Sequence, residues 1–407
     1  MTEKKYIGKT NILKELYYSG EISCADLSEK INKSLPNTMM QLTDLVEKKV
    51  VVEGGYAPST GGRRPLMYSL KHDFMYVLAV AVDQFSVRIG LTDMHNNPVS
   101  AIEKIEFDVY HNQNMVQELS DMIEAYIIKS GFEKKRIAGI GVGVPGFVDF
   151  NKGINYSIID SKSITKGITE KTGIRSFVDN DSSLIALAEL KFGVVKNAEN
   201  AMVINIGWGV GLGLILDGGL FRGSNGFAGE FSHIPLFANN KRCSCGKYGC
   251  LETEASLFVI VEKAKSKLLN GGLSSLNYEQ LVNVNIEEAF ELIRVAAFRG
   301  DKFAIELFSE AGYNIGRGVA ILIHVLNPDV VILSGRGSVA GKVWQAPIQQ
   351  AVNEHSIPRL AENTEIKISK LGHNAELIGA AALVVDRLSE DEINSYFTAN
   401  QKNALVG

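Results

Sequence analysis

The stretch AMVINIGWGVGLGLILDGGLF, residues 201–221, decides the fold of this 407-residue chain. It predicts a buried strand, a glycine-rich turn and a second strand, because aliphatic residues lie on both sides of the glycines. The stretch YVLAVAVDQFSVRIGLTD, residues 76–93, predicts another hairpin of the same kind. Helical patterns and buried strands follow each hairpin, including IAGIGVGVPG at 137–146 and VVILSG at 330–335. Two lobes that each open with a hairpin predict a duplicated α/β architecture with a cleft between them.

The composition narrows the class of protein. The chain is 45% hydrophobic, which is enough to fill the cores of two or three domains. Its formal net charge of -4 argues against a protein that coats nucleic acid along its whole length. The N-terminus does not form an apolar signal segment, and no stretch approaches the roughly 18 apolar residues of a membrane span. We therefore expect a cytoplasmic protein that does not contact membranes.

The N-terminal segment predicts a small domain ahead of the first hairpin. Apolar residues recur at helical spacing in three stretches, IGKTNILKELYYS (7–19), SCADLSEKI (23–31) and NTMMQLTDLVEKK (37–49). The strands KVVVEGGY and LMYSL follow, joined by STGGRRP at 59–65. This is the outline of a winged helix-turn-helix, and a three-helix bundle without DNA binding is the alternative. The two arginines on the glycine turn favour DNA binding, because they suit insertion beside or into a groove.

A winged helix would place its third helix in the major groove of DNA. The helical spacing predicts an inner face of Met39, Leu42, Leu45 and Val46. Three polar residues, predicted to face outward, are then the candidate base readers: Asn37, Thr38 and Gln41. Five basic residues are the candidates for phosphate and groove contacts: Lys33, Lys48, Lys49, Arg63 and Arg64.

The strongest local signal is HIPLFANNKRCSCGKYGC, residues 233–250. His233, Cys243, Cys245 and Cys250 make a complete tetrahedral ligand set for Zn²⁺. All four positions are taken by protein side chains, so the ion would be structural and would not activate a water molecule. The alternative is a group of buried thiols without a metal. A disulfide scaffold is not expected in a large cytoplasmic chain.

Two further motifs have both a functional and a structural interpretation. Asn180 and Asp181 end an apolar strand at the start of a helix, where they suit either sugar hydroxyls or a helix N-cap. Gly207, Gly209, Gly211 and Gly213 resemble a turn that cradles phosphates, but a tight hairpin also explains them. Trp208 interrupts this set with a bulky indole.

Taken together, these segments resemble the repressor branch of the ROK family (repressors, open reading frames and sugar kinases). The resemblance covers nearly the whole chain and includes STGGRRP, VDNDSSLIALAE, AGEFSH and CSCGKYGCLE. The cysteine motif is highly specific to the family, and the STGGRRP wing is specific to its DNA-binding branch. It implies a winged helix-turn-helix at residues 1–72 joined to a two-lobed actin/hexokinase-like (ribonuclease H-like) ATPase fold with a structural zinc site. The small lobe would span 73–192, completed by a C-terminal helix at about 385–407. The large lobe, 193–384, would carry the zinc site and the dimer interface.

The resemblance also implies site residues. The family's sugar ligands map to Gly146 in the Gly/Pro turn, Asn180, Asp181 at the position of the kinase general base, Glu230, His233 and Glu252, with Ser232 in place of the family's glycine. The family's nucleotide motif D-x-G-G-T is replaced by AVDQF at 81–85, and Trp208 takes the place of a small hydroxyl residue. The resemblance therefore implies that the sugar-binding residues are retained, that the phosphate-binding motifs are lost and that ATP does not bind.

We therefore expect a bacterial, sugar-responsive transcriptional regulator, a repressor of carbohydrate metabolism without kinase activity. A homodimer or homotetramer would bind a two-fold, double-stranded operator, and a sugar or sugar phosphate would change its affinity for that operator. Two alternatives stay open. One is an active sugar kinase with an added DNA-binding domain, and the other is a regulator controlled by a protein partner.

Overall fold

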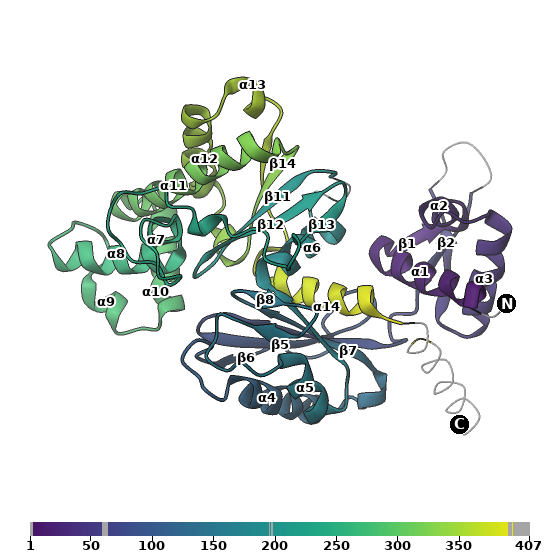
Figure 1. Ribbon diagram of the computed structural model, residues 1–407. Coiled ribbons are helices and arrows are strands. Elements are labelled where there is room, and N and C mark those ends of the chain that lie inside the picture. Colours follow the sequence, from purple (N-terminus) through teal and green to yellow (C-terminus); the bar gives the residue numbers. More distant parts are fainter. Residues whose placement is uncertain (1–2, 59–63, 195, 197, 390–392, 394–407) are drawn as a thin grey trace. The chain divides into compact units, whose positions relative to one another are not determined.

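The computed structural model describes residues 3–58, 64–194, 196, 198–389 and 393. The chain forms two compact units (Figure 1). The first comprises Met1–Asp179 together with Leu377–Gly407, and the second comprises Asn180–Glu376.

The first unit begins with three helices and a small antiparallel sheet. The elements are α1 (Glu3–Ser19), β1 (Glu21–Ser23), α2 (Cys24–Lys30), α3 (Leu35–Glu47), β2 (Val51–Tyr56) and β3 (Leu66–Leu70), and the strand order is β1-β3-β2. The Ser23 side chain caps α2 by accepting a hydrogen bond from the backbone N–H of Asp26. Pro36 lies in the first turn of α3, where its missing N–H costs nothing.

A five-stranded sheet forms the rest of the first unit, in the order β10-β7-β4-β5-β6. Its strands are β4 (Tyr76–Val82), β5 (Ser86–Thr92), β6 (Glu103–Glu106), β7 (Ile137–Val144) and β10 (Ser176–Asn180). The helices are α4 (Met115–Ser130), η1 (Lys134–Arg136), α5 (Ile164–Thr172) and α14 (Ala375–Arg387), and β8 (Val148–Asp149) pairs with β9 (Ile154–Asn155). The predicted hairpin is the antiparallel pair β4–β5, and β7 runs parallel to β4.

The second unit repeats this plan in the order β13-β12-β11-β14-β15. Its strands are β11 (Ala201–Ile206), β12 (Val210–Leu216), β13 (Gly219–Phe221), β14 (Val330–Ser334) and β15 (Glu365–Ile368). The hairpin β11–β12 is antiparallel, and β14 is parallel to β11. Both sheets therefore contain a hairpin whose first strand has a parallel neighbour, which confirms the predicted duplication.

Helices cover the second sheet, and each of the two units has its own buried apolar core. The helices of the second unit are α6 (Asp181–Phe192), η2 (Phe231–His233), α7 (Glu252–Ala255), α8 (Leu257–Leu269), α9 (Tyr278–Val282), α10 (Ile286–Phe298), α11 (Lys302–Leu326), η3 (Arg336–Ala340), α12 (Lys342–His355), α13 (Pro358–Ala361) and η4 (Gly372–Asn374). Within the part of the chain that the structure describes, no helix has the length and apolar character needed to cross a membrane.

The boundary between the units differs from the one expected from the sequence. Helix α6 belongs to the second unit, whereas the expected small lobe extended to residue 192. The physical reason is close packing of α6 on β12, where a Cβ atom at Gly211 would lie 1.9 Å from the Ser182 hydroxyl oxygen. The last described helix, α14, begins at residue 375, ten residues before the expected C-terminal helix. Residues 390–392 and 394–407 lie outside the described residues.

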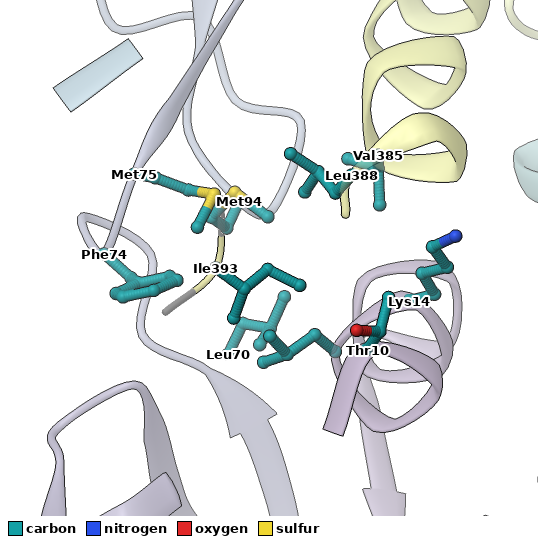
Figure 2. Close-up of a pocket in the computed structure, with 10 residues that line it drawn as sticks. Thr10, Lys14, Leu70, Phe74, Met75, Met94, Val385, Leu388 and Ile393 are labelled. Atoms are coloured by element: carbon teal, nitrogen blue, oxygen red, sulfur yellow. The ribbon is translucent and has the colours of Figure 1, made fainter. Parts of the chain in front are cut away.

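Within the first unit, α1 contacts α14. The Tyr18 hydroxyl donates to the Asp386 carboxylate at 2.5 Å, and the Lys14 ammonium donates to the Asp386 carbonyl oxygen at 2.7 Å. An apolar pocket lies beside these bonds (Figure 2), lined by Thr10, Leu13, Lys14, Leu70, Phe74, Met75, Met94, Val385, Leu388 and Ile393. The N-terminal helix is thus tied to the last helix by polar and apolar contacts.

Candidate functional site

The predicted metal ligands lie together in the second unit. The ligand atoms of His233, Cys243, Cys245 and Cys250 are all within 4.8 Å of one another. His233 Nδ1 lies 3.5 Å from Cys243 Sγ, and Cys245 Sγ lies 3.7 Å from Cys250 Sγ. Bonds of about 2.3 Å to a tetrahedral Zn²⁺ would separate two sulfur ligands by about 3.8 Å. The spacing of the side chains therefore fits a tetrahedral ion.

The loop that carries the cysteines is held by a tight turn and by a buried carboxylate. Gly249 has a φ of +74°, and a Cβ atom there would lie 2.0 Å from the Phe237 carbonyl oxygen. The buried Glu254 accepts from Asn239 at 2.6 Å and binds the ammonium groups of Lys241 and Lys263 at 2.6 and 2.8 Å. These contacts fix the backbone of the loop independently of an ion.

Without an ion, the most buried part of this set favours a neutral thiol. Burial, followed by hydrogen bonds to the two neighbouring thiols, raises the pKa of Cys250 to about 12. Metal ligation requires thiolates, so a metal ion that binds here must displace the proton of Cys250.

Three carboxylates gather next to the metal ligands. Burial first, and then the negative charges of Asp181 and Glu252, raise the pKa of Glu230 to about 7. Glu230 Oε2 lies 3.6 Å from His233 Nε2, on the side of the imidazole ring away from Cys243. Glu252 Oε1 accepts from the Ser244 hydroxyl at 3.3 Å. The predicted sugar ligands and metal ligands of this unit therefore share one site, in which His233 contacts both groups.

Asn180 and Asp181 have different roles. Asn180 Oδ1 accepts from the backbone N–H groups of Ser182 and Ser183 at 2.9 and 3.2 Å, so the N-cap interpretation holds for its oxygen. Asp181 Oδ2 accepts from Asn205 Nδ2 at 3.0 Å. Asn205 was not among the predicted site residues. Its signal was a single amide side chain within the otherwise apolar strand AMVINI.

Gly146, the remaining predicted sugar ligand, belongs to the first unit. Its φ is +97°, and a Cβ atom there would lie 2.5 Å from the Ser157 hydroxyl oxygen. That hydroxyl accepts from the backbone N–H of Phe147 at 2.8 Å. The glycine thus permits a tight turn at the end of β7.

The β4–β5 turn, which was expected to lack a phosphate motif, holds a carboxylate of its own. Asp83 Oδ1 accepts from the backbone N–H groups of Phe85 and Ser86, both at 2.8 Å. Asp83 Oδ2 accepts from the Ser86 hydroxyl at 3.0 Å. The carboxylate therefore occupies the donors that a phosphate oxygen would need at this turn.

The β11–β12 turn is also filled. Trp208 is buried, and the Arg336 guanidinium carbon lies 4.9 Å from the centre of its ring. Arg336 Nη1 lies 2.8 Å from Glu287 Oε1, and the Phe290 ring packs edge-on against Trp208. The backbone N–H of Gly207 donates to the Gly209 carbonyl at 2.9 Å. The indole at this turn thus packs against Arg336 and Phe290, and a backbone hydrogen bond closes the turn.

Helix α3 exposes a different face from the one the sequence predicted. Thr38 and Gln41, two of the candidate base readers, are only 1% and 6% exposed and cannot reach a DNA base. Met39, expected on the inner face, is 42% exposed. The buried positions 38, 41, 42 and 45 follow the i, i+3, i+4, i+7 pattern, so the helix is rotated relative to the expected one. Asn37 is half-buried.

The basic residues around α3 include exposed and paired side chains. Lys33, Lys49 and Arg64 are exposed. Lys48 binds Asp44 of α3 at 2.8 Å, and Lys9 of α1 binds the same carboxylate. Arg63 and residues 59–62 lie outside the described residues.

Comparison with known proteins assigns this fold and site to a class. The model of the ROK family matches residues 84–387, well over half of the chain. The chain therefore belongs to the ROK family.

Particular relatives extend the likeness to nearly the full length. The xylose repressor of Caldicellulosiruptor bescii is 30% identical over 404 residues, 95% of this chain and 98% of the repressor. A solved ROK family transcriptional regulator, a homologue of the E. coli MLC protein, has a TM-score of 0.76 and 25% identity over 97% of this chain and 99% of that chain. A glucokinase of Halalkalibacterium halodurans is 32% identical over 273 residues, 65% of this chain and 82% of the kinase. The two regulators therefore match a part of the chain that the kinase does not.

Proposed function

We propose that this chain is a sugar-responsive, DNA-binding repressor of carbohydrate metabolism without kinase activity. The observation that carries the proposal is the similarity to a xylose repressor over 95% of the chain, which includes most of the N-terminal helices and hairpin. The protein would act in the bacterial cytoplasm as a homodimer or homotetramer on a two-fold operator.

The N-terminal domain would bind DNA as a winged helix-turn-helix. Three helices, the β2–β3 hairpin and the exposed Lys33, Lys49 and Arg64 support this assignment. In this arrangement α3 lies in the major groove, and the connection between β2 and β3, with Arg63 and Arg64, is the wing.

The carboxylates of the second unit would bind sugar hydroxyl groups. Asp181, Glu230 and Glu252 supply acceptors, and His233 supplies a ring nitrogen. Asn180 and Gly146 complete the set that the family resemblance implies. A neutral sugar suits this cluster better than a sugar phosphate, because three carboxylates would repel a phosphate group.

The metal would be Zn²⁺ with a structural role. His233, Cys243, Cys245 and Cys250 would hold it, and a closed coordination shell would brace the loop that ends at Glu252. The ion would thereby help to orient His233 and Glu252 toward the sugar.

Two filled turns support the absence of phosphoryl transfer. Catalysis of this reaction depends on holding and neutralising the nucleotide phosphates. Asp83 would instead repel them at the first turn, and the buried Trp208 fills the second.

Selection and binding assays test the proposal on the full-length protein. A random duplex pool is selected for binding, and affinity for the selected DNA is then measured with a panel of monosaccharides. We expect a two-fold DNA site, a sugar that raises the melting temperature and shifts the affinity for that site, and no ATP turnover with that sugar. ATP-dependent phosphorylation of a sugar would favour the kinase alternative. Selected DNA with no response to any sugar would favour control by a protein partner.

A further inference from the structure

The exposed face of α3 is apolar. Leu35, Met39 and Met40 are 48%, 42% and 53% exposed, whereas the helix buries Thr38 and Gln41. The Tyr68 hydroxyl approaches Met39 Sδ at 3.8 Å, so this thioether is held against β3. The exposed large apolar side chains of α3 are therefore one leucine and two methionines, beside the exposed Pro36, Thr43 and Glu47.

The same helix offers few hydrogen-bonding groups to a base. Residues 35–47 contain neither arginine nor lysine, the usual partners of guanine O6 and N7. Asn37 Oδ1 accepts from Gln41 Nε2 at 3.0 Å, which competes with the two-bond contact that asparagine makes with adenine. The Thr43 hydroxyl donates to the Met39 carbonyl at 3.0 Å. Polar readout from this helix is thus weak.

We propose that α3 reads its operator through the C5-methyl groups of thymine, with Met40, Met39 and Leu35 as the contacts. The thymine methyl is the apolar group that the major groove presents, and aliphatic side chains recognise it. Methionine suits this contact, because its flexible thioether side chain adapts to a shaped apolar surface. Asn37 would add a single amide donor for an acceptor such as thymine O4.

The positive charge at both ends of the helix favours DNA over a protein as the partner that binds this face. Lys33 precedes α3 and Lys49 follows it, and both are exposed. A helix of this length spans about 20 Å, so one exposed lysine lies near each end of it. An apolar strip between two cations matches the methyl-lined floor and phosphate walls of an A·T-rich groove.

This inference rests on the proposed function, and its test separates the two. The full-length protein is first used to select duplexes from a random pool. Each thymine of the selected half-site is then replaced by deoxyuridine, which removes only the methyl group. We expect A·T-rich half-sites and a loss of about four-fold in affinity at one or more thymines, the factor that corresponds to burial of one methyl group.

Variants assign the contact to the helix. Met40→Ala should lower affinity for the thymine duplex and reduce its preference over the deoxyuridine duplex to near unity. Ile128→Ala, which truncates a 70% exposed apolar side chain on α4, should keep the preference. Selection of no DNA would overturn the proposed function itself. Selected DNA in which every deoxyuridine is neutral, or a Met40→Ala protein that keeps the preference, would overturn the inference alone. A changed oligomeric state in Met40→Ala with an unaltered thymine preference would identify the face as a protein interface.

Discussion

Replacement of Asp44 by asparagine tests how the charge on α3 limits DNA binding. The Asp44 carboxylate binds the ammonium groups of Lys9 and Lys48. Burial opposes its ionisation, but the hydrogen bonds and charges of the two lysines outweigh that effect and lower the pKa of Asp44. At neutral pH this group is therefore an anion that occupies two cations next to the proposed DNA surface.

The expected magnitude follows from counting the lysines that the substitution releases. Each lysine that gains a phosphate contact steepens the slope of log affinity against log salt by about 0.9, so two lysines add about 1.8. Between about 50 and about 200 mM salt, the variant should lose affinity by about twelve-fold more than the parent. At low salt, Asp44→Asn should bind DNA more tightly than the parent.

The assay is a salt titration of duplex binding by fluorescence anisotropy, with Glu47→Gln as the matched control. Glu47 is exposed on the same helix, and no ion pair to it occurs among the described residues. Glu47→Gln changes the net charge equally but releases no lysine, so its slope should stay close to that of the parent. Equal slopes for Asp44→Asn and Glu47→Gln, or a shallower slope for Asp44→Asn, would contradict the inferred neutralisation of Lys9 and Lys48.

Three further predictions concern metal binding and stability. Elemental analysis should find one Zn per chain in the parent and in Cys24→Ser, but not in Cys250→Ser; an unchanged metal content in Cys250→Ser would exclude the proposed ligand set. Burial opposes ionisation of Asp301, the N-cap of α11, but hydrogen bonds from Ser275 and Ala304 outweigh it and lower its pKa from 3.8 to about 2. Because this carboxylate stabilises the folded state above its unfolded pKa, Asp301→Asn should cost about 1–2 kcal/mol at pH 7, and the cost should vanish as the pH falls from about 4 to about 2; a cost independent of pH in chemical denaturation would argue against the ionised form. Tyr18→Phe should destabilise the first unit by about 1.5–3 kcal/mol, because the phenol donates to a carboxylate; a double-mutant cycle with Asp386→Asn that shows no coupling would refute this contact.

The sequence predicted the sheets well, because their signals are local. Each hairpin combines aliphatic runs with a short turn, and the predicted pairs appear as β4–β5 and β11–β12. The helical pattern expected after the first hairpin appears as α4. The metal set was equally local, since three of its four ligands lie within eight residues.

The facing of α3 was harder to predict, because Thr38 and Gln41 are polar residues on a buried face. Polarity suggested that both point outward, and the hydrophobic Met39 was assigned inward in exchange. In the structure Thr38 donates to the Ser34 carbonyl at 3.2 Å, and Gln41 donates to Asn37 at 3.0 Å. Local hydrogen bonds of this kind allow polar side chains to be buried. The helical spacing of hydrophobic residues does not predict such buried polar positions.

Contacts between distant segments were beyond prediction. Asn205 of β11 and Asp181 of α6 are 24 residues apart and meet because α6 packs on the β11–β12 hairpin. Glu254 binds both Lys241, which precedes it in the sequence, and Lys263, which follows it. None of these residues belongs to a recognisable sequence motif. Only the packing of the folded chain brings them together, so the sequence alone did not predict these contacts.

The proposed loss of phosphate binding rests on two turns, one in each unit, and this has a consequence for reversing it. At the first turn, substitution of Asp83 by asparagine would remove the charge but leave an amide oxygen that can still occupy the N–H groups of Phe85 and Ser86. At the second turn, a small residue in place of Trp208 would leave Arg336 beside Glu287, where the ion pair still engages the guanidinium. Neither change alone would create a free set of donors at its own turn, and phosphoryl transfer depends on holding and neutralising the nucleotide phosphates. We therefore expect that single substitutions at Asp83 or Trp208 will leave ATP turnover undetectable, since each turn opposes phosphate binding through its own bonds.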